Sequence, residues 1–195
     1  EFNMRKKIYI VALLLILIGV MCAQETIALI MKVQGSVNLE REGVAVKLEN
    51  GSLLSAGDRL MTGKDSYAAL KFIDGGAIIK LFPESDLVLN AKKEDNLLNK
   101  ESTLWKGGVF SKVERKLGKY SIETPTAIAS VKGTEFLTQV GENGETDIYT
   151  MKGILEFKNR NDTNSVELKN GNKAHSLGRG IIEVQEFNYS DLPQE

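Results

Sequence analysis

The sequence is poor in the residue types that most catalytic and metal sites use. Its 195 residues include one cysteine, Cys22, and one histidine, His175. A zinc site usually needs several Cys or His ligands, and a Ser-His-Asp site would have to use His175, near which no nucleophile motif lies. We therefore expect no enzyme activity, no metal and no cofactor, and we expect His175 at the surface. Carboxylates are plentiful, so a hydrolase with two close carboxylates stays open as an alternative.

Disulfides, a basic excess and ion-binding loops are also missing. One cysteine cannot form an intramolecular disulfide, so stability has to come from burial and hydrogen bonds. The net charge is −1 and the pI is about 6.1, which gives no basic footprint for nucleic acid. The cluster Asn161-Asp162-Thr163 lacks the glycine and terminal glutamate of an EF-hand loop, so we expect no calcium site there.

The one long apolar run lies near the N-terminus. Residues 8–17 are all apolar and follow Arg5, Lys6 and Lys7. A basic start before a short apolar run is typical of a secretion signal, and the run is shorter than the roughly 20 residues of a spanning helix. We expect residues 1–23 to be a helical signal peptide region and the remainder to be periplasmic or secreted.

Three fates of this segment stay open. The small residues at its end allow cleavage after Cys22 or Ala23, and the segment could also be retained as a membrane anchor. Lipidation of Cys22 is the third, although the preceding Met21 is larger than the residue that a lipoprotein signal places there. Contact with a membrane is expected only through this segment or through a lipidated Cys22.

Short extended segments separated by Gly and Asn turns fill the rest of the chain. Residues 66–72 alternate between apolar and polar, and Asp74-Gly75 and Asn143-Gly144 are hairpin signals. Residues 24–186 are therefore predicted to form one all-β domain, with a sandwich, a barrel and a solenoid as the open architectures. Residues 187–195 are predicted to be a frayed tail, although Phe187 or Tyr189 could dock.

Three segments are predicted to be irregular. Residues 91–102 carry mixed charges and are expected to form an exposed loop or one helical turn. Gly107-Gly108 is expected to form a tight bend. Residues 111–118 are rich in Lys and Arg and are expected to be a solvated connection, with contact to an acidic partner as the alternative.

Residues 124–136 form the most distinctive stretch. Pro125 fixes its own φ, Gly133 permits a turn that a residue with a Cβ would resist, and no strong nucleophile, base or metal ligand is present. Earlier in the chain, Asp58 is expected to stabilise a turn by accepting hydrogen bonds from backbone N–H groups. These residues are predicted to shape the backbone.

The order of these pieces resembles the FecR family. A Gly-Asp and a Thr-Gly bracket an apolar pair in residues 57–63, a strand ends in Asp-Gly in residues 68–76, and Thr-Pro-x-Ala leads to Val-x-Gly-Thr-x-Phe in residues 124–136. The resemblance covers roughly residues 33–156. It implies an all-β, non-catalytic envelope domain, and it favours a twisted β-helix-like solenoid, with a sandwich stack as the alternative. The best-known members are membrane regulators of iron uptake that relay a receptor signal to a sigma factor. Only Met4 to Lys7 precede the apolar run here, and the chain ends soon after the domain. We therefore expect neither the sigma-factor-binding region nor the additional receptor-contacting domain of those regulators.

Two functions follow from this resemblance. The first is recognition of an envelope partner through a sheet face or edge, with an accessory role in transmembrane signalling left open. The alternative is a structural or glycan-binding module of the envelope, for which Trp105, Tyr67 and Tyr120 would have to be exposed on one face. Because an aromatic side chain more often packs than stacks on a ligand, Trp105 is expected to be at least partly buried.

Overall fold

Strands make up nearly all of the regular structure. The computed structural model describes residues 25–115 and 118–192, and within them it contains seventeen strands, one short 3-10 turn (η1, Tyr189–Asp191) and no α-helix. The prediction of an all-β chain is confirmed. The predicted signal region and Cys22 lie outside the described residues.

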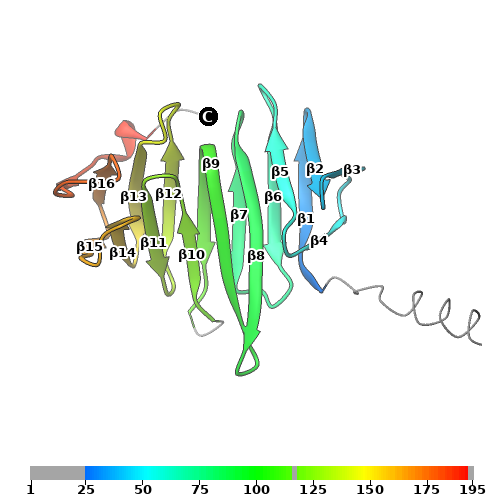
Figure 1. Ribbon diagram of the computed structural model, residues 1–195, viewed down its shortest axis with the longest axis horizontal. Helices are drawn as coiled ribbons and strands as arrows, with labels where there is room; N and C mark the ends of the chain where they lie inside the picture. Colours follow the sequence, from blue (N-terminus) through cyan, green and yellow to red (C-terminus); the bar gives the residue numbers. More distant parts are fainter. Residues whose placement is uncertain (1–24, 116–117, 193–195) are drawn as a thin grey trace, which may run out of the picture.

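The strands are arranged in two sheets that lie one over the other, so their strands overlap across the molecule in Figure 1. In the order of hydrogen bonding, sheet A contains β4 (Leu53–Ser55), β1 (Thr26–Gln34), β6 (Tyr67–Phe72), β7 (Ala77–Leu81), the second half of β9 (Leu97–Val113), β12 (Glu135–Val140), β13 (Thr146–Lys152), β16 (Asn172–Ser176) and β17 (Val184–Glu186). Sheet B contains β3 (Val44–Val46), β2 (Val37–Arg41), β5 (Arg59–Thr62), β8 (Asp86–Glu94), the first half of β9, β10 (Tyr120–Glu123), β11 (Ala127–Val131), β14 (Ile154–Asn159) and β15 (Val166–Lys169). Strand β9 passes from sheet B into sheet A and joins the two.

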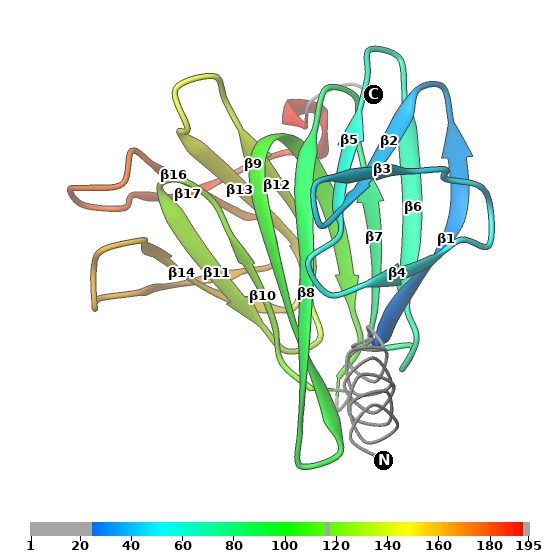
Figure 2. The ribbon, with the colours of Figure 1, turned by 45° about the vertical axis from the view of Figure 1, so that its right-hand side comes forward.

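Strands that follow one another in the chain often lie in opposite sheets, and each such pair forms a β-arch. The arches are β1–β2, β5–β6, β7–β8, the two halves of β9, β11–β12, β13–β14 and β15–β16. Neighbouring arches pair antiparallel, whereas β10 inserts into sheet B alone and runs parallel to β9. Figure 2 shows the two layers and the turns between them. The chain is therefore a solenoid-like stack of arches and a two-sheet sandwich at the same time, which brings the two predicted architectures together.

Every arch turns at a residue with left-handed φ. These residues are Gly35 (φ 73°), Asp65 (56°), Glu84 (54°), Gly107 (85°), Gly133 (77°), Gly153 (89°) and Gly171 (82°). At Gly107 the neighbouring arch is also very close, because an added Cβ would lie 2.5 Å from the Cα atom of Ser85. A side chain there would clash with backbone that cannot move away easily.

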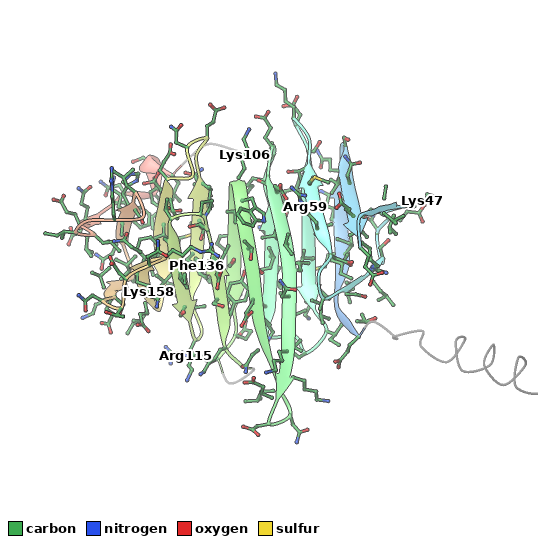
Figure 3. The ribbon with its side chains drawn as sticks, in the orientation of Figure 1. Lys47, Arg59, Lys106, Arg115, Phe136 and Lys158 are labelled. Carbon is green, nitrogen blue, oxygen red and sulfur yellow. The ribbon has the colours of Figure 1, made fainter. Side chains whose placement is uncertain are left out.

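The core lies between the sheets, where the alternate residues of each strand meet. Tyr120 occupies its centre, with the Phe72 ring 6.4 Å and the Phe136 ring 6.2 Å away between centroids; Phe136 is labelled in Figure 3. The Tyr120 hydroxyl lies 3.3 Å from Ser102 Oγ and 3.3 Å from Ser111 Oγ, so its polar end is satisfied. Burying each of these rings stabilises the fold by roughly 2 kcal/mol.

The prediction for residues 91–102 is wrong, because they form a long hairpin of β8 and β9. The pairing runs from Asp86 opposite Lys106 to Glu94 opposite Leu97, and Asp95 and Asn96 make the turn with positive φ. The mixed charges suggested a loop because most of these side chains face solvent, but two-residue turns of this kind connect strands directly.

The bend expected at Gly107-Gly108 is present inside β9, where Gly107 has a φ of 85° and the chain passes from sheet B into sheet A. Two smaller expectations need correction. Residues 111–113 still belong to β9, where Ser111 is fully buried, so the solvated connection begins later. The tail is docked where it begins, which confirms the alternative stated for Phe187, because this residue is buried and its ring packs 5.3 Å from the Tyr149 ring.

Candidate functional site

The distinctive stretch 124–136 has a structural role. Thr124 Oγ1 accepts a hydrogen bond from the Ala127 N–H at 2.9 Å and lies 2.6 Å from Thr146 Oγ1. Thr126 Oγ1 donates to the Gly144 carbonyl at 2.8 Å and also lies 2.8 Å from Thr146 Oγ1. These hydroxyl groups link the start of β11 to the hairpin between β12 and β13, and they are satisfied by one another. The motif therefore shapes backbone, as predicted, and offers no reactive group.

Asp58 also has the predicted role, and it has an ionic partner that the sequence did not indicate. Its carboxylate is completely buried and accepts a hydrogen bond from the Ser55 N–H at 2.8 Å. Arg41 donates to both of its oxygens at 2.7 Å, and this hydrogen bonding raises the pKa of the Arg41 guanidinium. A two-pronged pair of this kind fixes β2 to the turn before β5.

A second buried pair, between Lys100 and Asp74, lies at the same end of the strands. Lys100 is 1% exposed, and its Nζ atom lies 2.6 Å from Asp74 Oδ2 and 2.7 Å from the Leu98 carbonyl oxygen. Asp74 belongs to the hairpin between β6 and β7 in sheet A, whereas Lys100 lies in the sheet B half of β9. The pair therefore ties the two sheets together, and Lys100 is not the solvent-exposed charge that its surroundings in the sequence suggested.

The three aromatic residues of the glycan hypothesis do not share a face. Tyr120 is buried in the core, Trp105 is 48% exposed on the sheet B half of β9, and Tyr67 lies on β6 of sheet A. Trp105 is thus only partly buried, as expected. His175 is at the surface, as predicted, with Nδ1 2.8 Å from Asp147 Oδ1. Within residues 25–115 and 118–192, no group of three His, Cys, Asp or Glu side chains could hold a metal ion.

The best candidate for a binding site is a groove of about 950 Å³ on the outer face of sheet A. It crosses β7, β9, β12 and β13, because the residues that alternate with the core positions of these strands point outward. The apolar part of its lining consists of Phe82, Pro83, Phe110, Leu137, Val140, Met151 and Leu192, and the charged part consists of Lys80, Glu145 and Asp147. A groove of this size, mostly apolar with a few charges, is typical of a site for noncovalent binding.

Two local features shape the groove. Gly108 has no side chain, and a Cβ there would lie 2.9 Å from the Phe82 ring, so the ring packs directly on the backbone of β9. The ammonium group of Lys80 lies 5.5 Å from the centre of the Phe110 ring, within cation–π range. Charge and apolar surface are therefore interleaved along the floor.

One wall of the groove comes from residues 187–192, which we call the C-terminal strap. Phe187 and Tyr189 stack edge to face at 6.0 Å, the Tyr189 hydroxyl lies 3.4 Å from the Met151 carbonyl oxygen, and Leu192 lines the groove itself. Leu137 lines the same groove and is 4% exposed, although it points away from the core. The sequence does show an apolar residue on the outward side of β12, between the inward Phe136 and Thr138. This signal of a covered outer face was not used in the prediction.

The described residues that line the groove include no Ser, Thr, Cys or His. Among the described residues, no helix has the length and the apolar character needed to cross a membrane.

The comparisons with known proteins agree with this fold. The sequence profile of the family described as FecR protein matches residues 58–156. Two crystal structures of a candidate anti-sigma factor from Parabacteroides distasonis ATCC 8503, at 1.65 Å and 2.50 Å resolution, are similar to the chain with TM-scores of 0.54 and 0.55. Both are 14% identical to it over 66% of its residues, and the match spans 59% of the length of those chains. No curated protein matches the sequence significantly.

Proposed function

Because this chain belongs to the FecR protein family, we propose that it is a non-enzymatic recognition domain of the cell envelope with a part in signalling. Its partner is a protein, and binding takes place in the groove on the outer face of sheet A. Binding takes place outside the inner membrane, because the signal-like segment at residues 1–23 would export the domain to the periplasm or beyond. The role in signalling is suggested by the family and by the anti-sigma factor that shares the fold.

One observation carries this proposal: large apolar side chains line the groove and remain in contact with solvent. Phe110 and Met151 are only half-buried although neither contributes to the core between the sheets. Apolar side chains that line a groove on a protein surface are typical of sites where a partner supplies the missing contacts. The edges of the sheets offer less, because β3, β15 and β17 are only three or four residues long.

The test is capture of partners from an envelope extract with the tagged full chain, followed by mass spectrometry. We expect one or a few envelope proteins to be retained, and we expect Phe110→Ala to reduce their recovery at least tenfold. Trp105→Ala is the matched control, because it removes an exposed aromatic side chain from the sheet B half of β9. Equal recovery with Phe110→Ala, or retention of polysaccharide alone, would count against the proposal.

The localisation of the protein needs a separate measurement. Cell fractionation should find the domain in the envelope or the medium, and sequencing the N-terminus of the purified protein should find cleavage near Ala23. A blocked N-terminus on Cys22 would indicate lipidation, and an intact N-terminus would indicate a retained anchor. Recovery in the cytoplasm alone would contradict export.

A further inference from the structure

The two sides of the groove on sheet A differ in chemistry. Four neighbouring strands form the groove, in the order β7, β9, β12 and β13, as Figure 1 shows. Phe82 and Pro83 stand on the β7 side, and we call them the apolar wall. Glu145 and Asp147 stand on the β13 side, and we call them the acidic wall. A ligand on the floor of β9 and β12 therefore meets apolar side chains on one side and carboxylates on the other.

Glycines beside the floor allow both walls to lean inward. The Phe82 ring packs on Gly108 of β9. The Glu145 carboxylate lies against Gly141, directly after β12, where an added Cβ would overlap its Oε1 atom. Glu145 Oε2 also accepts a hydrogen bond from the Asn143 N–H at 3.1 Å. The Glu145 carboxylate is therefore held at the groove by contacts within the hairpin between β12 and β13.

The acidic wall has little counter-charge. Asp147 Oδ1 lies 2.8 Å from His175 Nδ1, and in the described part of the chain neither wall carboxylate forms an ion pair with a lysine or an arginine. Lys80 is the one basic residue among the described residues that line the groove, and it projects from β7, where its ammonium group lies 5.5 Å from the centre of the Phe110 ring. The lining therefore carries two carboxylates against one ammonium group, and the carboxylates lie together on the side away from the lysine.

We infer that the groove takes an extended polypeptide segment in which basic residues alternate with apolar ones. This inference rests on the function proposed above and names the chemistry of its partner. Successive side chains of an extended segment point to opposite sides, so a segment laid along β9 and β12 would turn its basic side chains to the acidic wall and its apolar ones to the apolar wall.

The spacing of the two carboxylates fits such a segment. Glu145 and Asp147 flank the inward Thr146, so they are two residues apart on one face of the chain. Residues two apart in an extended chain repeat at about 6.6 Å, both in β13 and in the ligand. An acidic segment would meet like charge at this wall, and a purely apolar one would cover the carboxylates without giving them a partner, which costs free energy.

The experiment measures binding of the full chain to a short fluorescein-labelled peptide in which lysine alternates with leucine, by fluorescence anisotropy. Three control peptides carry glutamate in place of lysine, serine in place of leucine, or the same residues with the lysines grouped at one end. The double variant Glu145→Gln/Asp147→Asn removes the charge of the acidic wall, and urea unfolding checks that it folds. Asp147→Asn alone keeps the bond between Glu145 and Asn143 and repeats the test if it does not. Glu101→Gln/Glu156→Gln is the matched control, because both side chains are exposed on sheet B.

We expect the alternating lysine–leucine peptide to bind more tightly than all three controls. Removing the charge of the acidic wall should weaken it at least fivefold, the sheet B control should leave it unchanged, and raising salt from about 0.05 M to about 0.5 M should also weaken it. No binding, equal effects of the two double variants, or a control peptide that binds as tightly would overturn the inference. If Phe110→Ala still reduces capture of an envelope protein while these peptides fail, the basic segment is refuted and the proposed function stands.

Discussion

The buried pair between Lys100 and Asp74 makes the sharpest prediction about stability, because the two partners are buried to different degrees. Lys100 is 1% exposed, and the Asp74 side chain is 23% exposed. Replacing Asp74 by Ala removes the carboxylate that faces the ammonium group of Lys100 in the core, which also donates to the Leu98 carbonyl. Breaking a buried pair in this way costs about 3–5 kcal/mol. For Asp74→Ala we expect a loss of about 3 kcal/mol, at the lower end of this range, because water can reach the vacated Asp74 position.

The reverse substitution should cost less. Lys100→Met leaves the Asp74 carboxylate, which still accepts a hydrogen bond from the Gly76 N–H at 2.8 Å and stays partly in contact with water. Methionine can follow the path of the lysine stem, and the Phe72 ring lies 5.9 Å from the present ammonium position. We expect a loss of about 1 kcal/mol, and about 2 kcal/mol for the double variant.

A double-mutant cycle separates the ion pair from the turn that Asp74 also supports. Independent effects would add to about 4 kcal/mol, so the expected coupling is about 2 kcal/mol. Urea unfolding of the full chain, followed by circular dichroism, measures each free energy. The coupling should persist at high salt, because a buried pair is screened little. Glu167→Ala, which removes an exposed partner of Lys169, should have no measurable effect.

The reasoning would be refuted by a coupling below about 0.5 kcal/mol, or by Lys100→Met costing more than Asp74→Ala. The first result would mean that solvent already reaches Lys100. The second would mean that the lysine stem, and not its charge, stabilises the junction of the two sheets.

Three further predictions concern the arches and the core. Gly107→Ala should lower the free energy of unfolding by about 3 kcal/mol in urea, because the new side chain combines a positive φ with a clash against Ser85. The control Gly43→Ala has a φ of 78° but open space around it, so it should lower the free energy by about 1 kcal/mol. Equal losses in the two variants would contradict the close approach of Ser85 to Gly107. Thr138→Val should raise the free energy of unfolding by about 1 kcal/mol, since the buried Thr138 hydroxyl has no hydrogen-bond partner among the described residues, and a decrease would show that the hydroxyl is bound. Burial raises the pKa of Tyr120, so the stability that its neutral phenol supplies is complete below about pH 10, the pKa of an unfolded tyrosine, and is lost as the pH rises further. Urea unfolding from about pH 8 to about pH 11 should show this loss in the wild type and less of it in Tyr120→Phe; parallel curves would argue against a buried phenol.

Several features of the fold followed from local patterns. The alternation in residues 66–72 matches β6, with Leu70 and Phe72 in the core. The turn at Gly133 and the strands on either side of it match the reading of residues 124–136. Such features depend on a few neighbouring residues, and steric limits on the backbone make them predictable without any knowledge of distant partners.

The hairpin of β8 and β9 was misread because charge was taken as a sign of a loop. Lys92 and Glu94 do face solvent, but the same segment carries Lys100 into the core. A lysine is buried only where a distant carboxylate meets it, and Asp74 lies far away in the sequence. The groove was missed for a related reason, since Phe110 and Leu137 come from strands that only the register sets side by side.

Local sequence was thus sufficient to predict many of the strands and turns, such as β6 and the turn at Gly133, because backbone sterics and side-chain alternation act over a few residues. Only the tertiary structure decided the passage of β9 between the sheets, the parallel strand β10, the buried Lys100 and the groove on the outer face of sheet A. Each depends on which strands pair and in what register. That choice minimises the free energy of the whole core at once, so no single segment encodes it.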